Sequence, residues 1–147
     1  ITGFSATLED VVGLEGASGL VARVGTEIGS DIADSHRDVD GQLPDDLVEI
    51  AGILTDLKSR IGGHFEVASV DDDGMVLTAS HCPFGKLVEG RPSLCMMTTN
   101  VFGRIVADAT GYARVEINEA LALGHRGCKV TVSLGKNQRD GGHEFFA

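Results

Sequence analysis

The sequence lacks tryptophan, has a single tyrosine, and carries only 12 lysines and arginines against 22 aspartates and glutamates. The formal net charge of −10 argues against direct nucleic-acid binding, because attraction to a polyphosphate requires a cationic surface. Anionic lipid surfaces are disfavoured for the same reason. No stretch approaches the roughly 18 uninterrupted apolar residues that indicate a membrane-spanning helix. We therefore expect neither a nucleic-acid nor a membrane partner.

Cysteine is also scarce, with three residues and no C-x-x-C pair. An odd number of cysteines argues against a disulfide framework. The N-terminal residues ITGFSATLED lack the cationic start and the apolar core of a secretory signal, so we expect a soluble protein of the cytoplasm. A chain of 147 residues is long enough for one domain whose core needs no disulfide or metal.

Hydrophobic periodicity predicts the fold class. Apolar residues recur at helical spacing in three segments, residues 17–34, 44–61 and 92–110. Apolar and polar residues alternate, as in half-buried strands, in residues 64–70, 75–80, 112–118 and 128–134. The order α-α-ββ-α-ββ predicts an α+β domain, an antiparallel sheet built from two hairpins and covered by three helices. Residues 135–147 show no periodicity, so we predict a single domain over residues 1–134 and a flexible C-terminal tail.

The first predicted helix contains three glycines, Gly19, Gly25 and Gly29. Each glycine inside a helix costs about 1 kcal/mol relative to alanine. We therefore expect a packing reason for them, and predict that this face of the helix lies close against another helix.

The three cysteines occur in distinct contexts: Cys82 in HCP, Cys95 in RPSLC, and Cys128 in GHRGC before an alternating strand. Thiolates are good ligands for zinc and iron–sulfur centres. Free cysteines are also commonly buried as small apolar side chains, and Cys128 shares a predicted strand face with Val130 and Val132. Spacing alone leaves both interpretations open.

These contexts resemble the C-terminal sensor domain of iron–sulfur-sensing winged-helix repressors, in which a CP dipeptide precedes a P-x-L-C element. The sequence is also similar to vinyl-reductase-type (4-vinyl reductase-like) sensor domains, which end in a glycine, a short turn and a final cysteine. A third similar family is the methanogen output domain. The segment IGGHFEVASVDDDGMVLTASHCP looks like the helix end, hairpin and CP turn of these families, and the resemblance extends over residues 17–134.

The resemblance implies a sensor domain for signal transduction or transcription regulation, usually a homodimer, which relays its signal to an attached output or DNA-binding module. It implies an iron–sulfur cluster or a zinc ion held by Cys82, Cys95 and Cys128, sensing redox state or metal supply. A fourth ligand is expected as well. His125, in a predicted tight turn three residues before Cys128, is the better candidate, and His81, adjacent to Cys82 on a strand, is the weaker one.

Two alternatives need no metal. An apolar ligand pocket would be lined by residues of the third predicted helix, although these also suit an ordinary core: Met97, Val101, Phe102 and Ile105. The domain could also serve only for dimerisation through its glycine-bearing first helix. No Walker, dinucleotide-binding or HExxH motif is present, and no nucleophile signature surrounds a cysteine, so we predict no enzymatic activity.

Overall fold

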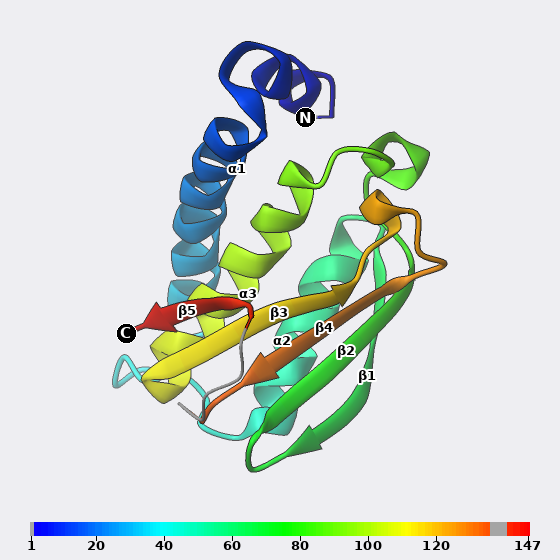
Figure 1. Ribbon diagram of the computed structural model, residues 1–147. Helices are drawn as coiled ribbons and strands as arrows, with labels where there is room; N and C mark the ends of the chain where they lie inside the picture. Colours follow the sequence, from blue (N-terminus) through cyan, green and yellow to red (C-terminus); the bar gives the residue numbers. More distant parts are fainter. Residues whose placement is uncertain (1, 136–140) are drawn as a thin grey trace.

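The computed structural model describes residues 2–135 and 141–147, and it confirms the α+β class (Figure 1). Three helices lie on one side of a five-stranded antiparallel sheet. The helices are α1 (Thr2–Ser35), α2 (Leu47–Arg60) and α3 (Ser93–Thr110). The strands are β1 (His64–Asp71), β2 (Gly74–His81), β3 (Tyr112–Glu119), β4 (Cys128–Ser133) and β5 (His143–Phe146). Two 3₁₀ turns, η1 (Gly85–Val88) and η2 (Leu121–Leu123), lie at the same end of the molecule.

The two predicted hairpins are both present and join into one sheet. Their strands pair β1 with β2 and β3 with β4, and the hairpins meet through antiparallel pairing of β2 with β4, giving the order β1-β2-β4-β3-β5. Helices α2 and α3 cover the sheet, and α1 packs on the outer side of α3. The main core forms where α2 and α3 meet the sheet, and includes Phe102, Leu54, Leu77, Val115 and Val130.

Local capping explains where the helices begin and end. The side chain of Asp46 accepts a hydrogen bond from the Val48 amide, so α2 begins at Leu47 rather than at Pro44 as predicted. Gly111 takes the left-handed conformation, with φ of 93°, and ends α3 as predicted.

Helix α1 is longer than the predicted segment and is broken once. At Gly13 the backbone leaves the helical region, with φ of 77° and ψ of 167°, so the residues before it form a separate arm. Within the described part of the chain, no helix is long and apolar enough to cross a bilayer.

The predicted close packing of the first helix is confirmed at two of its three glycines. A Cβ on Gly25 would lie 3.0 Å from Cβ of Asn100, and one on Gly29 would lie 2.8 Å from Cβ of Arg104, both on α3. The expectation is wrong for Gly19, which has nothing within 4 Å. Glycine therefore allows α1 to approach α3 closely over the second half of α1.

The prediction of an irregular tail after residue 134 is wrong at its end. His143–Phe146 form β5, which pairs antiparallel with β3, while residues 136–140 lie outside the described part. The strand is held by a side chain: the ring of Phe145 covers Gly103 of α3, where a Cβ would come within 3 Å of the ring carbons. Strand β5 is thereby anchored to both the sheet edge and the helix layer.

We predict that Gly103→Ala lowers the free energy of unfolding by about 1–3 kcal/mol, because the added methyl collides with the Phe145 ring. Gly52→Ala is the matched control: this α2 glycine has open space around it, so alanine should stabilise the helix by up to about 1 kcal/mol. Urea unfolding measures both changes. Adding Phe145→Ala to Gly103→Ala should recover part of the loss, and equal effects of the two glycine substitutions would contradict the packing described.

Candidate functional site

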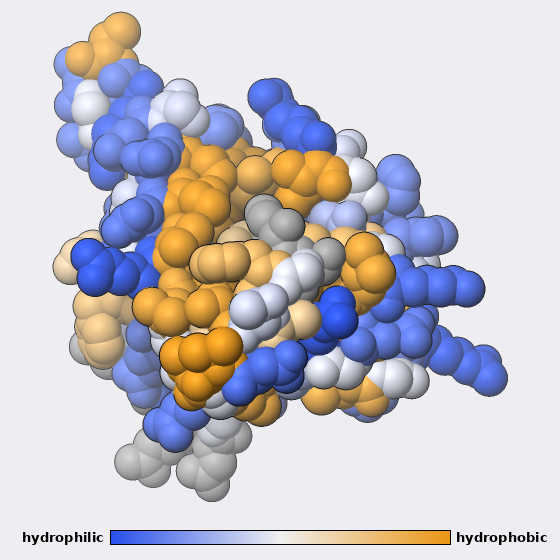
Figure 2. Space-filling view, turned by 90° about the horizontal axis from the view of Figure 1, so that it is seen from above, coloured by the Kyte–Doolittle hydropathy of each residue, from blue (hydrophilic) through white to orange (hydrophobic). Residues whose placement is uncertain are grey.

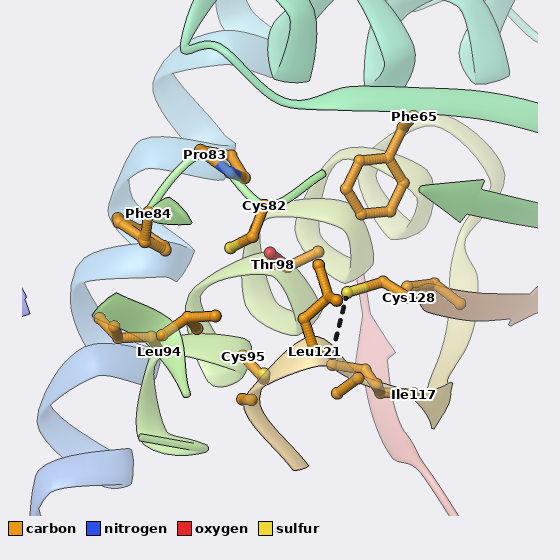
Figure 3. A pocket seen from close by; sticks show the side chains of 14 residues that line it. Phe65, Cys82, Pro83, Phe84, Leu94, Cys95, Thr98, Ile117, Leu121 and Cys128 are labelled. Atoms are coloured by element: carbon orange, nitrogen blue, oxygen red, sulfur yellow. Dashed lines mark hydrogen bonds between the residues drawn. The ribbon is translucent and has the colours of Figure 1, made fainter. Parts of the chain in front are cut away.

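The three cysteines, far apart in sequence, line one cavity at the end of the sheet where the 3₁₀ turns lie (Figure 3). Cys82 follows the last residue of β2, Cys95 lies in the first two turns of α3, and Cys128 is the first residue of β4. Each is partly buried, with a free thiol. The structure thus brings together the three cysteines that the sequence singled out.

The walls of the cavity are almost entirely carbon and sulfur. Besides the cysteines, they are formed by Phe65, Pro83, Phe84, Val88, Leu94, Thr98, Ile117, Ala120, Leu121, Ala122 and Val130. The free space in which the centre of a water-sized molecule can lie is about 30 Å³, room for a few waters at most. The cavity is therefore nearly filled by its own walls.

Burial keeps the thiols of Cys82 and Cys95 protonated. Burial, together with the neighbouring Cys128 and Cys82, which disfavour a second negative charge, raises the pKa of the Cys95 thiol to about 11. Burial also raises the pKa of Cys82, against a hydrogen bond with the Phe84 backbone that lowers it. The Leu121 amide donates to Sγ of Cys128 at 3.5 Å. At neutral pH, Cys82 and Cys95 are neutral, polarisable groups.

Lys58 is the residue at this site that the sequence analysis missed. It lies on α2 and is only 5% exposed, and its Nζ donates to Oγ1 of Thr98, a cavity residue, at 2.6 Å. Nζ also lies 5.5 Å from the ring centre of Phe65 and 5.4 Å from that of Phe102, within cation–π range. The helical spacing of the sequence indicates its burial, because Lys58 follows Leu54 by four residues and so lies on the core face of α2.

Burial lowers the pKa of Lys58 to about 8, while the three cysteines act in the opposite direction. A lysine is seldom fully buried unless it is paired. Within the described part of the chain, Lys58 has a hydroxyl, two aromatic faces and three nearby thiols in place of a carboxylate. The apolar wall of the cavity is therefore backed, behind Thr98, by one amine whose charge these residues compensate poorly.

The metal centre implied by the resemblance does not fit these side chains as they lie. Among residues 2–135 and 141–147, no group of three or more cysteine, histidine, aspartate or glutamate side chains is placed to hold a metal ion. Neither expected fourth ligand lines the cavity: Nδ1 of His125 bonds the Ala120 backbone, and Nδ1 of His81 bonds Oγ of Ser80. An iron–sulfur cluster or zinc ion stays a prediction.

The four residues considered for an apolar pocket belong to the main core. Val101, Phe102 and Ile105 are buried in it, and the partly buried Met97 packs against it. Met97 also lines a hollow between α3 and residues 4–24 of α1. The cavity that the three cysteines line is a different one and lies at the start of α3.

Comparisons with known proteins show the fold and the family of the chain. The solved structure of the phenol-responsive sensory domain of the transcription activator PoxR with phenol superposes with a TM-score of 0.74, at 18% identity, covering 95% of this chain and 75% of that one. At this identity the match establishes the fold. No curated protein sequence matches significantly. The model of the methanogen output domain 1 family matches residues 1–133, and the chain therefore belongs to the methanogen output domain 1 family.

Proposed function

We propose that this domain is a sensory module that binds a small, largely apolar molecule in the three-cysteine cavity and passes its occupancy to an output module on the same chain or a partner. The observation that carries the proposal is the cavity itself, walled by carbon and sulfur from α3, the β2–η1 segment, η2 and β4, with a buried amine at its edge. Apolar pockets with a few polar groups are the usual form of small-molecule sites.

The polar groups indicate the kind of molecule. Oγ1 of Thr98 lines the cavity, and Nζ of Lys58 is bonded to it. An ammonium has three donors, and the contact with Thr98 uses one. A ligand with an apolar ring and a weakly acidic or hydrogen-bond-accepting oxygen would cover the apolar wall and bring an acceptor to Lys58. Phenol has this chemistry, and the similar sensory domain responds to it.

Filling the cavity requires its walls to move, because a ring does not fit in about 30 Å³. The mobile walls would be η1 and η2, which belong to a small apolar cluster separate from the main core, formed by Val88, Leu94, Ala120 and Ala122. One hydrogen bond, from the Gly90 amide to the Ala122 carbonyl at 2.9 Å, links the two segments. Occupancy would thus be converted into displacement of these segments.

The displacement has a direct route to α1. Leu94 and Cys95, both cavity residues, lie at the start of α3. Next to them, Oγ of Ser93 donates to Oε1 of Glu9 in the N-terminal arm of α1. A shift at the cavity would therefore reach both the α1–α3 contact and the arm, and through them an attached module.

We predict that phenol raises the melting temperature saturably, because a ligand that binds only the folded state stabilises it, by about 2.7 kcal/mol at a concentration 100 times its Kd. Thr98→Met should abolish the shift by filling the cavity. Thr131→Met, on the solvent side of β4, is the matched control and should leave the shift unchanged. Differential scanning fluorimetry and calorimetric titration measure these effects.

Two results would contradict a phenolic ligand: no saturable binding of phenol, or equal binding by the Thr98→Met variant. Metal analysis of the same protein, purified without oxygen, tests the metal centre that the sequence resemblance implies. Stoichiometric zinc, or iron with sulfide, lost on Cys95→Ser, would identify a metal centre in place of the organic ligand.

We predict that Lys58→Met is neutral or stabilising at pH 7 and removes part of the pH dependence of stability. With a folded pKa of about 8, below the ordinary value of 10.5, Lys58 disfavours folding while it is protonated. That penalty is relieved as the pH rises through 8, because the unfolded chain then holds the proton more tightly. The full shift corresponds to about 3 kcal/mol.

The measurement is urea unfolding at pH 7 and pH 9 for the wild type, Lys58→Met and Lys86→Met, an exposed control. The stability of the wild type and of the Lys86→Met variant should rise more between these pH values than that of the Lys58→Met variant. Lys86→Met keeps the interaction between Lys58 and the cysteines, whereas Lys58→Met removes it, so the comparison reports on Lys58 together with that interaction. If the free energy of unfolding changes equally between pH 7 and pH 9 in all three proteins, Lys58 is not a buried cation.

We further propose that the domain works as a homodimer through the outer face of α1. Leu20 and Val24 are 49% and 47% exposed, and with Phe4, Leu8 and Met97 they line an apolar groove between α1 and the start of α3. Figure 2 shows apolar side chains gathered across this end of the molecule, beside the projecting arm.

A second copy suits this groove because the charges beside it are self-complementary. Arg23 and Glu27 lie on the same helix, with Nε of Arg23 3.6 Å from Oε1 of Glu27, so a two-fold axis near Val24 would bring each to the opposite charge of the partner helix.

We predict that the wild type is dimeric by light scattering and that Val24→Glu makes it monomeric. Val39→Glu, in the exposed loop before α2, should stay dimeric. A monomeric wild type at 100 µM (about 1.5 mg/ml) would contradict the proposal.

A further inference from the structure

A pair of exposed histidines lies outside the three-cysteine cavity, at the open end of the first hairpin. His64 begins β1 and His81 ends β2, and the two are directly paired in the strand register. Both are exposed, and their ring centres are 5.9 Å apart with the planes at 86°. Neither residue contributes to the core or to the cavity.

The spacing is close to that of two imidazoles on one metal ion. With metal–nitrogen distances of about 2.0–2.1 Å and tetrahedral geometry, two ligating rings have centres roughly 5 Å apart. The observed separation is therefore within about 1 Å of a chelate, a difference that small side-chain rotations on paired strands remove. Pairing of the two strands holds opposed residues close together, so less conformational entropy is lost when both bind one ion.

The hydrogen bonding of His81 leaves Nε2 of its ring available to bind a metal ion. Nδ1 of His81 lies 2.9 Å from Oγ of Ser80. When Nδ1 carries the proton and donates it to this hydroxyl, the lone pair of Nε2 points away and is free to bind. Metal-bound histidines usually have their second nitrogen held by such a partner.

The surroundings supply further oxygen atoms. His64 lies in a shallow hollow that is also lined by Glu66, Glu119, Thr78, Ser80 and Arg126. The carboxylates of Glu66 and Glu119 outnumber the guanidinium of Arg126, so the charge around the hollow favours a cation. No third side chain of the described residues is already in place, so water or a moving carboxylate would take the remaining positions.

We propose that His64 and His81 form a two-histidine site for a divalent ion that favours imidazole, such as Ni²⁺, Zn²⁺ or Cu²⁺. The ion clamps the ends of β1 and β2 together. Cys82 follows His81 directly, so the clamp fixes the point at which the chain enters the three-cysteine cavity. The site is distinct from the predicted thiolate centre, for which His81 was considered only as a fourth ligand.

The experiment is calorimetric titration of the full chain with NiCl₂, using the wild type, His64→Gln, His81→Gln and His36→Gln. His36 is a close control for His81, because it is exposed and its Nδ1 also lies near the hydroxyl of the preceding serine, at 3.1 Å from Oγ of Ser35. We expect one site in the wild type and in the His36→Gln variant. Either substitution in the pair should weaken Ni²⁺ binding at least tenfold.

Equal Ni²⁺ affinity in the wild type and both pair variants, or no binding by the wild type below 1 mM, would overturn the proposal. Cys128 borders both this hollow and the three-cysteine cavity, so the titration is repeated with Cys128→Ser, which should bind Ni²⁺ as the wild type does. Loss of binding in that variant would assign the ion to thiolates and overturn the two-histidine site. Phenol binding by the His64→Gln variant reports separately on the proposed sensory function.

Discussion

Close packing on both sides of α3 is the constraint on which the rest of the structure depends. The helix lies between α1 and the sheet, and buried side chains occur around much of its circumference, including Leu94, Phe102 and Val106. Such a helix needs neighbours that can come close. Glycines of α1 provide this on the outer side, and Gly103 of α3 itself provides it for Phe145 on the inner side. The positions of these glycines therefore determine which elements can pack against α3 on each side.

The three-cysteine cavity lies where this dense packing gives way. At the start of α3, the main core is replaced by a smaller apolar cluster in which Leu94 of α3 packs with Val88 of η1 and Ala122 of η2. Short segments with few buried neighbours are the parts of a protein that open at low cost. Lys58 adds a second local weakness, since a buried amine that has no carboxylate partner among residues 2–135 and 141–147 disfavours the folded state. Sites of function commonly carry such costs.

Most of the fold could be predicted from the sequence because helices and strands of this length repeat their apolar residues several times. The β5 strand could not, since four residues hold too little alternation and its position depends on the absence of a side chain at Gly103. Local context singled out the three cysteines, but only the fold shows that they share a cavity. Lys58 was not among the candidate residues, although its spacing from Leu54 places it on the buried face of α2.

The break at Gly13 gives the N-terminal arm an unusual mechanical position. The arm meets α3 through Glu9 and Ser93, while its covalent link to the rest of α1 passes through one residue without a side chain. Glycine turns between backbone conformations at little steric cost. In the proposed mechanism, a small shift of Ser93 would therefore reach a helical segment on a single pivot, and this lever would enlarge a movement of the cavity wall into a swing of the N-terminal arm.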